Sequence, residues 1–270
     1  MEEKRLSLKD IQDAEYALMC NLVDFLESHN LTYLLCGGTM LGAIRHNGFI
    51  PWDDDVDLFM PRDDYEKLKE LVRTKQYKHE YYVLKMPGDD RYGYPFIKMQ
   101  DTRIKLEEEF HSEDFEAFLF IDIFPLDHLP ENEKLQKALF LWNRVQRAAV
   151  VTKLIKTGLN RSKAEQVIAK ALYKIWGGYQ NVNKKIDEFG KQTDAKHKNS
   201  PILRNLVWGD AVKQYLKADE LYPLKKHPFE DREFNIPNKY EPYLQRCYGD
   251  YMTPPPESER ARHFFKAYWL

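Results

Sequence analysis

The 270-residue chain is expected to adopt an α+β fold, in which a mixed sheet with flanking helices is followed by a helical C-terminal half. Short apolar runs separated by turn residues dominate up to about residue 130, and apolar residues at helical spacing dominate from residue 132 onward. Hydrophobic residues make up 43% of the chain and charged residues 31%, which is typical of a folded protein with a sizeable core.

The first elements are a helix, a strand and a glycine turn. Ser7 with Asp10 three residues later predicts a helix start, and apolar residues at helical spacing extend that helix to about residue 28. Residues 31–36 form an apolar strand that ends at Gly37 and Gly38. We expect Thr39 to cap a short helix, whose first backbone N–H groups would offer an anion site.

An acidic strand follows. Residues 55–60 alternate polar and apolar, so Asp55 and Asp57 are expected on one face and the apolar residues in the core. Pro61 suits the start of the next helix, with Asp63 and Asp64 in its first turn.

Three further strands are expected at residues 81–86, 96–100 and 118–124. The last of them carries one acid, Asp122, inside an apolar run. A lone buried carboxylate is costly, so Asp122 needs a partner. Two interpretations stay open: a metal ion shared with the acidic strand, or a backbone cap or paired arginine. Asp127, just beyond, is interpreted as a cap or turn residue.

The second half is expected to be mainly helical. Helices are predicted from residue 132 and over residues 163–176 and 179–189, a polar mobile loop over 194–200, short strands over 229–237 and a helix over 240–247. In the first of these helices the expected buried stripe consists of Leu135, Leu139, Trp142, Val145 and Ala149. Its basic residues would face solvent, and a role of that basic face at a membrane stays open.

Composition excludes some functions. The net charge is −2, so the chain has no basic excess for binding nucleic acid. The three cysteines, Cys20, Cys36 and Cys247, argue against a disulfide framework and fit a reducing compartment. No signal sequence is recognisable, and no run reaches the roughly 18–20 apolar residues of a membrane span. We expect a cytoplasmic protein, with peripheral contact to the inner face of the membrane left open.

The run from Asp53 to Asp57 holds four carboxylates in five residues. Carboxylates this close repel one another unless a cation is present, and Mg²⁺ (or Mn²⁺) takes oxygen ligands together with substrate phosphate. We therefore expect a metal site that handles phosphate. Asp53 and Asp54 either belong to it or only tune the charge of the loop. A calcium-binding EF-hand is excluded, because its required glycine and glutamate positions hold Leu58 and Asp64.

Several segments closely resemble the LicD family, which is related to fukutin. They are residues 37–39, 41–46, 48–57, 61–62 and 121–127, and, near the end, 236–238, 243–244 and 248–252. The resemblance thus covers nearly the whole chain, and its first long motif is highly specific.

The resemblance implies a nucleotidyltransferase-like core over residues 1–130, with residues 131–270 completing the cleft and the acceptor side. It assigns Asp55 and Asp57 as the paired acids and Asp122 as the third, together serving as metal ligands and catalytic groups. The implied reaction transfers phosphocholine, or a related phospho-alcohol, from a CDP-linked donor such as CDP-choline. The implied acceptor is a cell-surface glycan, such as teichoic acid or lipopolysaccharide, in free or lipid-linked form.

Further candidates come from residue chemistry. The expected contacts to the donor phosphates are Gly37, Gly38, Thr39, Arg45 and Lys98, and the expected contacts to choline or the base are Trp52, Tyr92, Tyr94 and Trp208. Arg45 has the alternative of pairing with a nearby acid, and His46 that of a structural hydrogen bond. A metal-dependent glycosyltransferase that uses a nucleotide sugar is the competing enzyme class, and an inactive scaffold is disfavoured by the intact acids.

Overall fold

The computed structural model describes residues 5–108, 117–154, 163–209, 214–260 and 265–270. Its strands are β1 (Leu34–Leu35), β2 (Asp57–Pro61), β3 (Tyr82–Lys85), β4 (Ile97–Glu108), β5 (Phe118–Leu129), β6 (Ile202–Arg204), β7 (Leu216–Lys217), β8 (Lys225–Phe229), β9 (Arg232–Ile236) and β10 (Phe265–Trp269). The main sheet runs in the order β1-β2-β5-β4-β10, with β3 also on β4, and with β6 and β7 continuing from the end of β5. Only the β2–β5 pairing within this sheet is parallel among the described strands, so the sheet is mixed.

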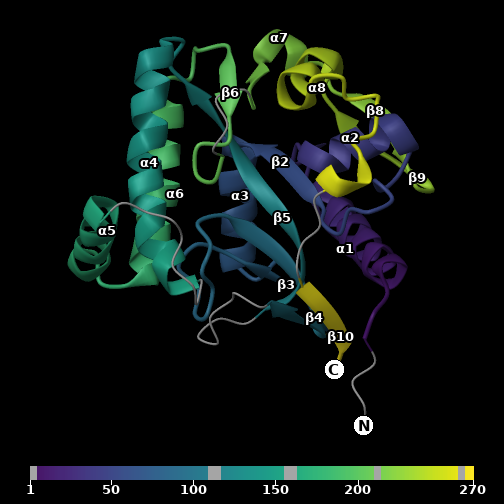
Figure 1. Cartoon of the computed structure of the whole chain (residues 1–270), viewed down its shortest axis with the longest axis horizontal. Coiled ribbons are helices and arrows are strands. Elements are labelled where there is room, and N and C mark those ends of the chain that lie inside the picture. The colour runs from purple at the N-terminus through teal and green to yellow at the C-terminus, as the bar shows by residue number, and fades with distance from the viewer. Residues whose placement is uncertain (1–4, 109–116, 155–162, 210–213, 261–264) are drawn as a thin grey trace.

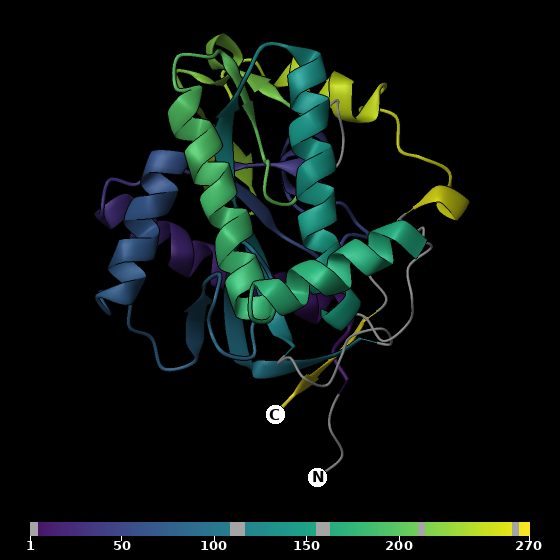
Figure 2. The same cartoon turned by 90° about the vertical axis from the view of Figure 1, so that its left-hand side faces the viewer.

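Helices lie on both sides of that sheet. They are α1 (Leu8–Ser28), α2 (Gly37–His46), α3 (Arg62–Arg73), α4 (Glu133–Leu154), α5 (Lys163–Ile175), α6 (Tyr179–Lys196), α7 (Ala218–Leu221) and α8 (Tyr240–Tyr248), followed by a short 3-10 turn (Glu257–Glu259). Figure 1 shows α4, α5 and α6 on one side of the sheet and α1 on the other. Figure 2 shows α4 and α6 side by side. The expected α+β class is confirmed.

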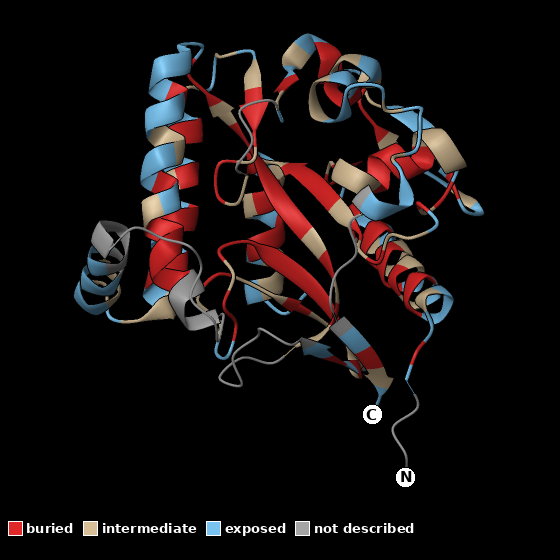
Figure 3. Cartoon of the chain, viewed as in Figure 1, coloured by how far each residue is buried: buried red, intermediate tan, exposed pale blue. Residues whose placement is uncertain are grey.

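Local signals account for the start of the chain. Ser7 accepts a hydrogen bond from the amide of Asp10, and the Asp10 side chain accepts from the amide of Ser7, which forms the expected capping box. The apolar stripe of α1 then lies in the main core with β1, β2, β4 and β5, as the buried strands and inner helix faces in Figure 3 show.

The two long strands β4 and β5 reach beyond the main core. β4 has an irregular register between Asp101 and Lys105, which divides it into two pieces. The first piece packs in the main core, whereas Ile104 and Leu106 of the second piece join a small separate cluster with Leu6, Leu119 and others. β10 pairs with that second piece.

A buried ionic network joins α3, β5 and α6. Arg62 Nε donates to Asp127 Oδ1 at 2.6 Å, and Arg62 Nη1 donates to Asp187 Oδ1 at 2.7 Å. Lys69 also pairs with Asp187. All four side chains are buried. Asp127 is therefore a strand residue in an ion pair, and its interpretation as a cap or turn residue is wrong.

Two other expectations for the second half are wrong. Leu135 and Trp142 are exposed, because α4 buries polar side chains instead: Asn143 donates to the carbonyls of Leu206 and Val207. Residues 194–196 belong to α6, where Asp194 is buried and accepts a hydrogen bond from the amide of His128. The second half also supplies β6 to β10. No helix in the described ranges has both the length and the apolar character to cross a bilayer.

Candidate active site

Asp57, Asp122 and Lys98 lie in one row across three neighbouring strands. Asp57 of β2 is the register partner of Asp122 of β5, and Asp122 is the partner of Lys98 of β4. Direct partners on adjacent strands present their side chains on the same face. Lys98 Nζ lies 2.6 Å from Asp122 Oδ1, and the lysine is buried. The sheet therefore holds an acid pair with a cation at one end.

Asp55 lies just before β2 and acts electrostatically on Asp57. Burial raises the pKa of Asp57 well above its usual range, and the negative charges of Asp55 and Asp122 raise it further, whereas Lys98 opposes the shift. The backbone ladder continues toward Asp55, because the amide of Asp122 donates to the carbonyl of Val56 at 2.9 Å. The structure thus brings the three predicted acids together.

Because they lack a Cβ, the two glycines at the start of α2 leave room for neighbouring carboxylates. Gly37 has a positive φ of 54°, and a Cβ there would lie 3.1 Å from Asp57 Oδ2. A Cβ at Gly38 would lie 2.7 Å from Asp53 Oδ2. Asp53 therefore belongs to the site by position, and both glycines keep the helix start open to these acids.

Thr39 does not cap α2. The helix begins at Gly37 with Cys36 in the N-cap position, and Cys36 makes no side-chain capping bond. Thr39 is buried, and its Oγ1 accepts a hydrogen bond from the amide of Asp57 at 2.8 Å. Thr39 thereby ties α2 to the first residue of β2 and fixes where the acid lies.

Aromatic rings surround Lys98. Its Nζ lies 3.2 Å from the ring centroid of Phe120 and 4.3 Å from that of Tyr94. Tyr94 in turn contacts Trp208 and Tyr92, with ring centroids 5.8 Å and 5.7 Å apart. Three of the four expected aromatic contacts thus gather beside the acid row, but Tyr94 faces Lys98, and Trp208 faces Arg147 with the guanidinium 5.3 Å from its ring centroid.

Trp52 is the fourth, and its ring faces two arginines. The guanidinium of Arg260 lies 4.1 Å from the Trp52 ring centroid, and that of Arg45 lies 5.9 Å away. Arg45 also donates to the carbonyl of Tyr251 at 3.0 Å and to His46, and no ion pair with an acid is found for it among the described residues. Within the described residues Arg45 therefore makes no ion pair, although Asp53 acts on it electrostatically, and His46 makes a structural hydrogen bond.

Sequence reasoning missed Glu15 and Tyr248. Burial raises the pKa of Glu15 well above its usual range, and Asp55 and Asp54 raise it further. Tyr248 of α8 is 42% exposed, and its partial burial raises its pKa, with contributions from Cys247 and Asp57. Glu15 was detectable, because it continues the buried stripe of α1 between Ile11 and Leu18. Tyr248 lies in segment 248–252, which resembles the LicD family, but nothing in the sequence assigned it a role in the site.

The acids fit a divalent cation in donor chemistry, since all are oxygen ligands whose mutual repulsion a cation relieves. In the described part of the chain, no three acidic, histidine or cysteine side chains form a ready-made metal site. This absence agrees with the geometry of the acid row, where Asp122 Oδ1 forms an ion pair with Lys98.

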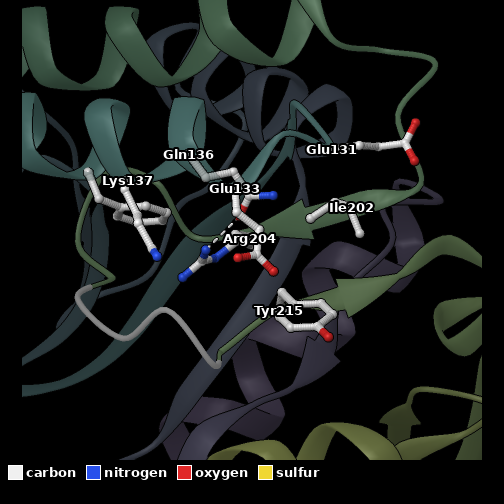
Figure 4. A pocket seen from close by; sticks show the side chains of 8 residues that line it. Glu131, Glu133, Gln136, Lys137, Ile202, Arg204 and Tyr215 are labelled. Carbon is white, nitrogen blue, oxygen red and sulfur yellow. Dashed lines mark hydrogen bonds between the residues drawn. The ribbon is translucent and has the colours of Figure 1, made fainter.

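A separate pocket of about 110 Å³ lies between α4, β6 and β7. Figure 4 shows Arg204 within it, hydrogen-bonded to Gln136. Burial lowers the pKa of Arg204 to about 10. Because Glu131 and Glu133 line the same pocket as Arg204 and Lys137, its charges are mixed, and none of its lining residues belongs to the acid row.

Comparison with known proteins agrees with the motifs. Residues 30–157 match the family described as LicD/FKTN/FKRP, nucleotidyltransferase domain. The chain is 30% identical to the lipopolysaccharide cholinephosphotransferase LicD of Haemophilus influenzae, over 99% of this chain and all of that protein.

Two other relatives match shorter parts. An uncharacterized protein of Rickettsia typhi is 36% identical over 31% of this chain and 24% of its own length. The ribitol 5-phosphate transferase FKRP of Homo sapiens is 44% identical over 18% of this chain and 10% of its own length. Because the similarity to LicD of Haemophilus influenzae extends over essentially the whole of both chains, the protein belongs to the LicD family.

Proposed function

We propose that this protein transfers phosphocholine from CDP-choline to a hydroxyl group of a cell-surface glycan precursor, with lipopolysaccharide as the first acceptor to test. The observation that carries the proposal is the row of Asp57, Asp122 and Lys98 with Asp55 beside it. Its support from relatives is the full-length similarity to a lipopolysaccharide cholinephosphotransferase. Teichoic acid is the second acceptor to test.

Asp55 and Asp57, with Asp122 as third ligand, would hold Mg²⁺ or Mn²⁺, which when bound neutralises the donor diphosphate and the leaving nucleotide. Asp122 is the proposed proton acceptor, because Lys98 favours its charged form. The acceptor oxygen forms a bond to the phosphorus of phosphocholine, the bond from that phosphorus to cytidine monophosphate breaks, and the hydroxyl proton passes to Asp122.

The helix start at Gly37 and Gly38 would receive the donor phosphates beside Asp53 and Asp57. Arg45 lies at the other end of α2 and contributes positive charge near Trp52. Tyr94 and Trp208 supply an apolar wall next to Lys98. These residues would bind and orient the donor without taking part in proton transfer.

Calorimetry tests the donor. CDP-choline, UDP-sugars and GDP-sugars are titrated into the protein with and without Mg²⁺, and the expected result is Mg²⁺-dependent binding of CDP-choline alone. Asp55→Asn should abolish that binding, whereas Asp90→Asn, which changes an exposed acid outside the site, should leave it unchanged. Preference for a nucleotide sugar would replace this proposal with the glycosyltransferase, and preference for another CDP-alcohol would change the transferred group.

A further inference from the structure

Large apolar side chains are concentrated on the outward surfaces of α4 and α5. We define the α4–α5 outer face by Leu135, Leu141, Trp142, Val167, Ile168 and Ile175. They make up six of the eleven large apolar side chains exposed in the described part of the chain. Ile175 is 75% exposed, Val167 67% and Leu141 61%. Exposed apolar groups gathered in this way mark an interaction surface.

The spacing of the exposed apolar residues on α5 shows that they form a stripe along that helix. Val167 and Ile175 lie eight residues apart, on one helix face with the exposed Ala171 between them. Leu172 and Tyr173 of α5 pack against the main core, away from this stripe. The helix therefore has apolar side chains both toward the core and toward solvent, and packing within the chain accounts only for the inner set.

Positive charge accompanies the stripe. Among the described side chains of α4 and α5, five lysines and arginines and one glutamate are exposed, although the whole chain has a net charge of −2. Lys170 and Lys174 are exposed along one edge of the α5 stripe, and Lys134 and Lys137 are exposed on α4. Figure 2 shows both helices on the side of the molecule that faces the viewer.

We propose that the α4–α5 outer face binds the surface of an anionic lipid bilayer. Apolar side chains of an amphipathic helix enter the boundary between head groups and acyl chains, while lysines extend to the anionic head groups. A protein partner would have to combine an apolar surface with acidic side chains opposite the lysines. An anionic bilayer offers both, because its acyl chains take up the apolar side chains and its head groups attract the lysines.

The inner side of α4, opposite the outer face, borders the surroundings of the acid row. Arg147 of α4 donates to the carbonyl of Trp208 at 2.5 Å, and Trp208 packs against Tyr94 beside Lys98. Under the proposed function, docking through α4 and α5 would hold the protein at a bilayer that carries a lipid-linked acceptor. The docking itself rests on α4 and α5 alone and does not require the transfer reaction.

Vesicle cosedimentation tests the docking. The full chain should sediment with vesicles of phosphatidylethanolamine and phosphatidylglycerol and remain in solution with vesicles of phosphatidylcholine. Val167→Ser and Ile175→Ser should each weaken binding about tenfold, because each removes an apolar side chain from the acyl boundary. Lys170→Glu with Lys174→Glu should weaken it by a similar factor or more.

Matched controls are Met252→Ser and Lys225→Glu, which change exposed residues outside the face and should bind like the unaltered chain. Absence of binding to the anionic vesicles, or binding that the α4–α5 variants leave unchanged, would overturn the proposal. So would a dimer in analytical ultracentrifugation that Ile175→Ser dissociates without any vesicle binding. Asp55→Asn should still bind vesicles, which separates this result from the donor test.

Discussion

Asp57 and Asp122 are direct partners across the parallel strands β2 and β5, so the sheet itself places two carboxylates side by side. The backbone hydrogen bonds of the sheet fix their separation before any ligand arrives. Such an arrangement costs stability in the free protein and provides a prepared site for positive charge.

Asp57→Asn should make the protein more stable and inactive in transfer. The raised pKa of Asp57 means that its ionisation opposes folding at neutral pH, above the usual carboxyl pKa of about 4. Removing the charge should therefore raise the free energy of unfolding at pH 7. Urea unfolding in a chelator measures this, and a less stable variant would contradict it.

Lys98→Met should be strongly destabilising, because it leaves Asp122 in the sheet without its ion-pair partner. A loss of about 3–5 kcal/mol is expected for removing one member of a buried pair. Combining it with Asp122→Asn should restore a large part of that loss. A double-mutant cycle in urea gives the coupling energy, and strictly additive effects would refute the interpretation.

Arg62→Met should reduce stability by about 3–5 kcal/mol, because Asp127 and Asp187 lose a shared buried cation. Lys67→Met is the matched control on the same helix, since Lys67 forms an exposed ion pair with Asp64. It should leave stability nearly unchanged, because exposed ion pairs contribute little. Thermal unfolding compares the two variants. Similar losses of stability would show that burial does not determine how much an ion pair contributes to stability.

Asp194 should stabilise the fold in a pH-dependent way. Burial alone would raise the pKa of Asp194, but hydrogen bonds from His128 and Lys198 outweigh it and lower the pKa to about 2. Since an unfolded carboxyl titrates near about 4, this stability is complete above that pH and is lost as pH falls toward 2. Asp194→Asn should cost roughly 2 kcal/mol at pH 7 and progressively less below pH 4. Urea unfolding over a pH series measures it, and a constant difference would contradict the prediction.

Local sequence patterns predicted several elements of this structure. Ser7 and Asp10 marked the helix start, and the alternation around Asp55 and Asp57 marked the acidic strand. The pairing of Lys98 with Asp122 had no such signal, because it depends on the register between β4 and β5. The expectation of a partner for Asp122 was sound, but a pattern in one strand does not identify a residue in another.

The α4 prediction failed for a related reason. Periodicity assigns apolar residues to the inside, but Asn143 and Arg147 lie inward because the carbonyls of Leu206 and Trp208 accept their hydrogen bonds. These acceptors lie about 60 residues away in sequence. Burial of a polar side chain is determined by the partner it meets, and that partner belongs to the tertiary structure.

The register irregularity in β4 also has a consequence for local opening. Beyond it, Ile104 and Leu106 are held by the small cluster, while Ile97 and Met99 are held by the main core. Fewer buried contacts favour partial opening at lower free energy. Backbone amides at Ile104–Glu108 can therefore exchange with solvent deuterium without the strand piece that carries Lys98 leaving its place.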